Sequence, residues 1–112
     1  KDSSGNWENT KLLLEIEGLD VYPGSERTLL DALSRNSRGC ITATANVAAP
    51  MLNSMIAFYQ NQQAEKANQV HSVVMKFREV LEKYPPIAAL KSIKEMQVNA
   101  AFEEMVAAFN QL

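Results

Sequence analysis

The chain has 112 residues, and its eleven Lys and Arg against thirteen Asp and Glu give a formal net charge of -2 at pH 7. This balance excludes a basic surface for nucleic acid or anionic lipid, and no apolar run approaches the ~20 residues of a transmembrane helix. With 46% hydrophobic and 21% charged residues, the composition is that of a globular domain. Cys40 is the only Cys and His71 the only His, which excludes an internal disulfide and a Cys-rich or His-pair metal site.

The first part of the chain alternates helix and strand patterns. In order, it predicts a helix over residues 11–17 capped by Asn9 or Thr10, a strand over residues 19–22, a helix from Ser25 or Glu26 onward, and a buried strand over residues 40–45. Gly18, Pro23-Gly24 and the run from Asn36 to Gly39 supply the breaks between them.

The rest of the chain is predicted to be helical. Pro50 suits the first turn of one helix, and Pro85-Pro86 separates the next two. The clearest apolar stripe repeats at steps of three and four residues through Ala67, Val70, Val74, Phe77, Leu81 and Tyr84. Further apolar faces are predicted for Ile87, Leu90 and Ile93, and for Phe102, Met105, Val106, Phe109 and Leu112.

Alternating helices and strands are typical of an α/β protein with a parallel sheet. Two strands cannot cover their own faces and edges, so the sequence requires more strands than it contains. A (β/α)8 TIM barrel needs ~250 residues. The chain starts at Lys1 without a Met or a leader, so either its true start was removed by processing or it is the C-terminal piece of a longer chain. The organisation of the remaining residues favours the second, and we expect the C-terminal portion of such a barrel, with the last βα units in residues 1–49 and a final barrel helix plus helical extension in residues 50–112.

Four motifs, in order and spacing, resemble one enzyme family over most of residues 1–95. They are Lys1-Asp2-Ser3-Ser4-Gly5, the turn Val21 to Glu26, the run Gly39 to Ala48, and Tyr84 to Lys91 with its two prolines. The chain is similar here to the dihydrodipicolinate synthase and N-acetylneuraminate lyase superfamily, which are class I pyruvate-dependent aldolases on a (β/α)8 barrel. The resemblance implies that residues 1–49 run from the end of strand six through strand eight.

The resemblance implies that Lys1 is the Schiff-base lysine. Its amine would attack the keto carbon of pyruvate or a 2-keto acid, and the resulting imine would act as an electron sink for making or breaking the adjacent C–C bond. From position alone, Lys1 is equally a solvated lysine without a role. Ser3 lies where the family carries a hydroxyl near the substrate, and its alternative role is a turn or capping hydroxyl.

The resemblance implies substrate contacts at four further residues. Gly24 and Glu26 follow strand seven, where an acidic residue faces substrate hydroxyls in sugar-acid aldolases; Glu26 alternatively complements a helix dipole. Ile41 would offer backbone groups near the pyruvoyl end, or only pack in the barrel. Ala43 replaces the hydroxyl residue of neuraminate lyases, so the chain is closer to 2-keto-3-deoxygluconate aldolases, with a dihydrodipicolinate synthase-type condensation of pyruvate and an aldehyde as the alternative.

The family's carboxylate-binding turn and proton-relay tyrosine would lie before Lys1, so we expect the 112 residues alone to be inactive. The intact protein is expected to be a cytoplasmic lyase, a homotetramer as is common in the family, without a cofactor or metal and without a nucleic-acid or membrane partner. A hypothesis from another class is a non-catalytic half-barrel interaction module, in which the helices after Asn46 dock a partner.

Overall fold

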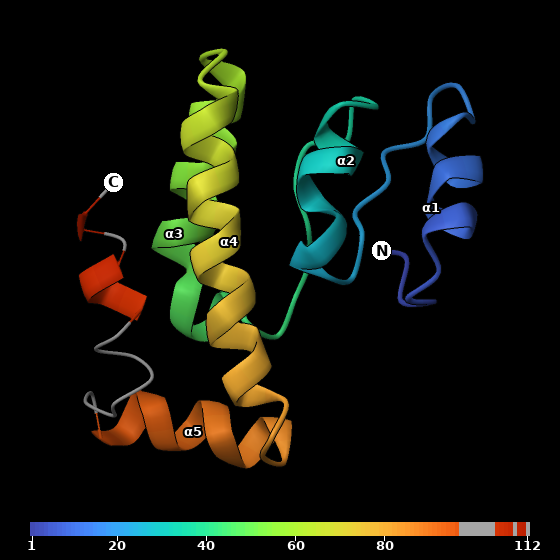
Figure 1. Cartoon of the computed structure of the whole chain (residues 1–112). Coiled ribbons are helices and arrows are strands. Elements are labelled where there is room, and N and C mark those ends of the chain that lie inside the picture. Colours follow the sequence, from blue (N-terminus) through green and yellow to red (C-terminus); the bar gives the residue numbers. More distant parts are fainter. Residues whose placement is uncertain (97–104, 109, 112) are drawn as a thin grey trace. The chain divides into compact units, whose positions relative to one another are not determined.

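The computed structural model of the protein describes residues 1–96, 105–108 and 110–111 (Figure 1). Its elements in chain order are α1 (Trp7–Leu14), the 3₁₀ helix η1 (Glu26–Thr28), α2 (Leu29–Leu33), α3 (Ala45–Gln60), α4 (Ala64–Leu81) and α5 (Pro86–Met96). The chain divides into two compact units, unit 1 (Lys1–Ala43) and unit 2 (Thr44–Leu112). The division predicted after residue 49 rests on the order of barrel units and stays a prediction.

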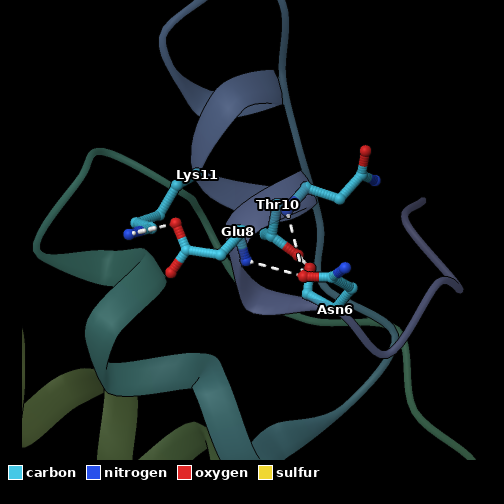
Figure 2. A network of polar contacts seen from close by, with 5 residues as sticks. Asn6, Glu8, Thr10 and Lys11 are labelled. Atoms are coloured by element: carbon cyan, nitrogen blue, oxygen red, sulfur yellow. Dashed lines mark hydrogen bonds and ion pairs between the residues drawn. The ribbon is translucent and has the colours of Figure 1, made fainter.

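Helix α1 begins at Trp7, earlier than the predicted start at Lys11. Figure 2 shows the reason, because Asn6 Oδ1 accepts hydrogen bonds from the backbone N–H groups of Glu8 (3.0 Å) and Asn9 (3.4 Å). Asn6 is therefore the N-cap, and the predicted caps at Asn9 or Thr10 are wrong. The helix ends before a turn in which Gly18 has a φ of +77°, a conformation that glycine adopts without steric cost.

The two predicted strands, residues 19–22 and 40–45, are not formed as strands in the described part of the chain. Only an isolated parallel bridge between Asp2 and Pro23 is present. The β-branched residues give the correct extended tendency, but a ladder needs paired neighbours over several residues. In addition, a turn at Thr44 and the start of α3 at Ala45 end the second segment early.

The helix predicted after Ser25 is confirmed as η1 followed directly by α2. Ser25 Oγ accepts a hydrogen bond from the Arg27 N–H (3.2 Å) and so caps η1. Leu29 and Leu33 are buried as the spacing predicts. The predicted break follows, with Asn36 in the left-handed region at a φ of 68°.

In unit 2, α3 runs from Ala45 to Gln60 and joins two helical parts across the non-helical residue Ala48, so Pro50 lies in the first turn of the second part, as predicted. Proline lacks the N–H that would bond back to the preceding turn, and its ring crowds that turn. The helix accommodates it by a kink at Ala48, which has φ −124° and ψ 16°. Met51, Leu52 and Met55 are buried and form the apolar face of this helix.

Helices α3 and α4 pack side by side, and α5 contacts both (Figure 1). The predicted stripe on α4 is confirmed, since its members through Leu81 are buried, whereas Tyr84 lies beyond the helix and is exposed. Helix α5 begins at the predicted proline pair and buries Ile93. Of the last predicted helix, Met105 is buried in a helical stretch over residues 105–108, while Phe102, Phe109 and Leu112 lie outside the described residues. None of the described helices is both long and apolar enough to cross a membrane.

Candidate active site

Three extended segments of unit 1 are joined through backbone hydrogen bonds. Asp2 N–H donates to Tyr22 O (2.9 Å), and Gly24 N–H donates to Asp2 O (2.7 Å), which is the pattern of a parallel bridge. Ile41 N–H donates to Pro23 O (3.0 Å). The segment around residue 23 therefore lies between the segments around residues 2 and 41, so residues far apart in the sequence are brought together.

At Gly24 the first two segments approach each other closely. A Cβ atom at this position would lie 2.7 Å from Asp2 O, 3.2 Å from Lys1 Cε and 3.3 Å from Ser3 Cα. The first distance is shorter than any normal contact, so the backbone pairing requires glycine here. The second places the aliphatic stem of Lys1 directly over Gly24, with its chain end exposed to solvent.

The Asp2 carboxylate is held at the start of α1. Its Oδ2 accepts a hydrogen bond from Thr10 Oγ1 (2.5 Å), and its Oδ1 accepts from Ser4 N–H (2.9 Å) and Asn9 Nδ2 (3.3 Å). These bonds, from Thr10 first and then from Ser4, lower the pKa of Asp2 from 3.8 to about 2. Asp2 is therefore ionised at neutral pH, and its negative charge lies near a helix N-terminus.

Glu26 and Thr42 form a second buried polar contact. Thr42 Oγ1 donates to Glu26 Oε2 (2.5 Å), and the Glu26 side chain is 0% exposed. The contact links the turn after Gly24 to the third segment. Burial, with a smaller contribution from the Glu26 charge, raises the pKa of the Cys40 thiol from 9.0 to about 11. A thiol with so high a pKa is a poor nucleophile, so Cys40 behaves as a small apolar residue.

The structure brings Lys1, Ser3 and Gly24 together at one end of the paired segments. Ile41 contributes its backbone N–H to this pairing while its side chain is 49% exposed, and Ala43 is exposed. Glu26 lies in the same unit but is enclosed and bonded to Thr42. The roles of these six residues as catalytic or substrate-binding groups stay predictions.

The sequence interpretation missed the buried polar residues that hold this region in place. Asp2, Thr10 and Thr42 are buried and hydrogen-bonded, and Ser37 Oγ donates to Val21 O (2.8 Å). Only Asp2 carried a signal, as an acidic residue directly after the candidate lysine and shortly before a helix. In the described residues, no group of three or more His, Cys, Asp or Glu side chains is arranged to hold a metal ion.

Comparison with known proteins identifies the family. The model of the Dihydrodipicolinate synthetase family matches residues 1–103. The chain is 29% identical over 99 residues to a 4-hydroxy-tetrahydrodipicolinate synthase of Bacillus subtilis (strain 168), covering 87% of this chain and 34% of that protein. It is 36% identical over 62 residues to an uncharacterized DapA-like lyase of Chloroflexus aurantiacus, covering 54% of this chain and 21% of that protein.

A 4-hydroxy-tetrahydrodipicolinate synthase of Pseudomonas savastanoi pv. phaseolicola is 29% identical over 83 residues, which cover 72% of this chain and 28% of that protein. The chain thus spans about a third of the length of the curated relatives it matches, or less. No solved structure matches it. The family match extends over most of the chain and confirms the resemblance found in its motifs: the chain belongs to the Dihydrodipicolinate synthetase family.

Proposed function

We propose that the full-length protein is a class I pyruvate-dependent lyase or aldolase in which Lys1 forms the Schiff base. The proposal rests chiefly on the position of Lys1. Its side chain lies against Gly24, next to Ser3, where the parallel segments are hydrogen-bonded. Membership of the family implies a TIM-barrel-related fold and supports this chemistry. In a parallel α/β barrel, catalytic residues lie at the carboxyl ends of the strands.

The finer part of the fold proposal assigns the three segments to strands six, seven and eight of a (β/α)8 barrel. The order of their hydrogen bonds supports it, because the segment of residues 22–24 is hydrogen-bonded to Asp2 on one side and to Ile41 on the other, as a central strand would be. Unit 2 would then carry the final barrel helix and the C-terminal helical extension. The single bridge of the described chain would extend into ladders in the complete barrel.

The proposed reaction proceeds through an imine and an enamine formed on the Lys1 amine. Lys1 Nζ attacks the keto carbon of pyruvate, and loss of water gives a protonated imine. The imine withdraws electrons, so a base takes up a methyl proton and an enamine forms. The enamine carbon then attacks an aldehyde carbonyl, forming the C–C bond and breaking the carbonyl π bond, and the conjugate acid of that base protonates the resulting alkoxide. Hydrolysis of the imine by one water molecule releases the product and regenerates the amine. Cleavage follows the same steps in reverse.

Two substrate classes remain as proposals. The turn Gly24-Ser25-Glu26 and Ala43 favour a 2-keto-3-deoxy sugar acid such as 2-keto-3-deoxygluconate. Similarity to the two 4-hydroxy-tetrahydrodipicolinate synthases favours a synthase-type condensation of pyruvate with an aldehyde. Burial of Glu26 against Thr42 favours the second, because an enclosed carboxylate is not available to accept a substrate hydroxyl. Release of pyruvate from 2-keto-3-deoxygluconate by the full-length protein would support the first class.

The test of the Schiff base is borohydride trapping with pyruvate in the full-length protein, followed by peptide mass mapping. We expect one pyruvate-derived adduct at Lys1 and complete loss of that adduct in Lys1→Ala. The matched control is Lys11→Ala, which removes a half-buried lysine ion-paired to Glu8 and leaves trapping unchanged. Trapping that persists in Lys1→Ala at another lysine would overturn the assignment.

A homotetramer in the cytoplasm is proposed on the family resemblance alone. The molar mass of the full-length protein in sedimentation equilibrium tests the assembly. The non-catalytic interaction module remains the alternative from another class. It predicts no adduct with pyruvate, together with a partner complex that survives Lys1→Ala.

A further inference from the structure

Asp2 fixes the main chain next to Lys1 through both of its backbone polar groups. Its N–H donates to Tyr22 O (2.9 Å) and its C=O accepts from Gly24 N–H (2.7 Å), so both of its backbone polar groups are paired with the neighbouring segment. Consecutive Cα atoms are ~3.8 Å apart. A displacement of the Asp2 backbone therefore moves the Lys1 Cα with it and swings the amine at the end of the longer side chain.

The Asp2 side chain fixes the same residue to a different element. Its carboxylate accepts from Thr10 Oγ1 (2.5 Å) and Asn9 Nδ2 (3.3 Å), which belong to α1, and from Ser4 N–H (2.9 Å) in the intervening loop. Hydrogen bonds to an ionised carboxylate are about twice as strong as neutral ones. Asp2 and Thr10 are both buried, so water does not compete freely for these bonds.

We propose that Asp2 is a positioning residue for Lys1, holding its amine over Gly24 through the contact with Thr10. The proposal rests on the proposed function, since it assigns Asp2 a part in forming the imine. Asp2 does not touch the substrate in this scheme. It acts by keeping Lys1 in register with Gly24 of the neighbouring segment.

The experiment compares four forms of the full-length protein: wild type, Asp2→Asn, Thr10→Val and Thr10→Ser. Asp2→Asn replaces the carboxylate by an uncharged amide, which weakens the hydrogen bonds that Asp2 accepts from Thr10, Ser4 and Asn9. Thr10→Val keeps the shape of the side chain but removes the donor, and Thr10→Ser keeps the donor. The readout is the rate constant of pyruvate trapping at Lys1 across pyruvate concentrations, per folded molecule as measured by circular dichroism.

A misplacement of about 1 Å costs up to ~100-fold in rate, so we expect Asp2→Asn and Thr10→Val to trap about 10- to 100-fold more slowly at saturating pyruvate. The half-saturating pyruvate concentration should change by less than about twofold, because ground-state binding is not altered. Thr10→Ser should trap at the wild-type rate. The double variant Asp2→Asn with Thr10→Val should be about as slow as Asp2→Asn alone, since Thr10→Val removes one of the three hydrogen bonds that Asp2→Asn already weakens.

A wild-type rate per folded molecule in Asp2→Asn or Thr10→Val overturns the positioning role, even if both variants unfold at lower temperature. In that outcome wild-type trapping at Lys1 still supports the proposed function. Absence of trapping in the wild type overturns the proposed function and this inference with it. The two failures are therefore distinguished by the wild-type protein alone.

Discussion

Both units bury apolar side chains, such as Leu29 and Leu33 in unit 1, but they differ in the polar side chains that they bury. In the described residues of unit 1, buried polar side chains tie distant segments together: Asp2, Thr10, Glu26, Ser37 and Thr42. In unit 2, burial is dominated by apolar side chains of α3 and α4, such as Met55, Val74 and Phe77. Hydrogen bonds are directional, whereas apolar burial is not. The residues proposed for catalysis and substrate binding thus lie in the unit in which directional hydrogen bonds between buried side chains help to fix the geometry.

The sharpest test of this contrast is Phe77→Ala in the full-length protein. Phe77 is 2% exposed on α4, so truncation removes apolar contacts and leaves a cavity. We expect a loss of about 3–5 kcal/mol in the free energy of unfolding, measured by denaturant titration. The control Tyr84→Ala removes an aromatic ring that is 59% exposed and should cost less than about 0.5 kcal/mol.

The same variant tests whether unit 2 contributes only stability. Under conditions where Phe77→Ala remains folded, pyruvate trapping at Lys1 should proceed at the wild-type rate per folded molecule. A slower rate would show that apolar packing in unit 2 also sets the geometry around Lys1, which would erase the distinction between the units.

The contrast also explains which features were predictable from the sequence. The α4 stripe was predicted correctly from Ala67 to Leu81 because the period of a helix is local. The enclosure of Glu26 was not predicted, since it depends on Thr42, sixteen residues further along. The segment over residues 40–45 was predicted from its residue types, but a ladder needs partners that this stretch of sequence does not supply.

Family motifs identified more of the candidate site than hydrophobic periodicity did. Lys1, Ser3 and Gly24 were selected by resemblance, and the structure brings them into one place. The cap at Asn6 was missed because Asn9 and Thr10 are also good cap residues by type. Choosing between them requires the hydrogen bonds of the folded chain.

Within unit 1, Gly24→Ala tests the close approach beside Lys1. The new Cβ would meet a backbone oxygen at 2.7 Å, so the paired segments must separate. We expect a loss of about 1–3 kcal/mol in the free energy of unfolding. We also expect pyruvate trapping at Lys1 to slow by about tenfold or more, because the amine shifts with its segment.

The matched control is Gly18→Ala, where a Cβ would meet nothing within 4 Å but φ is +77°. A left-handed conformation costs an alanine about 1–2 kcal/mol, so the two variants are similar in stability. Only Gly24→Ala should slow trapping. Equal trapping rates in both variants would mean that the approach of the segments does not set the position of Lys1.

The smallest expected effect concerns the start of α1, shown in Figure 2. Asn6→Ala removes the acceptor for the N–H groups of Glu8 and Asn9 and should cost about 1 kcal/mol in thermal or denaturant unfolding. Glu8→Ala removes the ion pair with Lys11 (2.7 Å), in which the Glu8 side chain is 74% exposed. That loss should be a few tenths of a kcal/mol.

Salt separates these two contributions at the same helix end. Charges on an exposed surface are largely screened in about 1 M salt, so the effect of Glu8→Ala should disappear there. A hydrogen-bonded cap is not an ion pair, and the effect of Asn6→Ala should persist. If the effect of Asn6→Ala on the free energy of unfolding also disappeared in salt, charge would stabilise the start of α1. Directional hydrogen bonds would then stabilise unit 1 only at its buried contacts. The Asp2 carboxylate accepts hydrogen bonds from Asn9 and Thr10 of this same helix. A cap that resists salt would therefore keep these two donors in place at high salt, and with them the proposed position of Lys1.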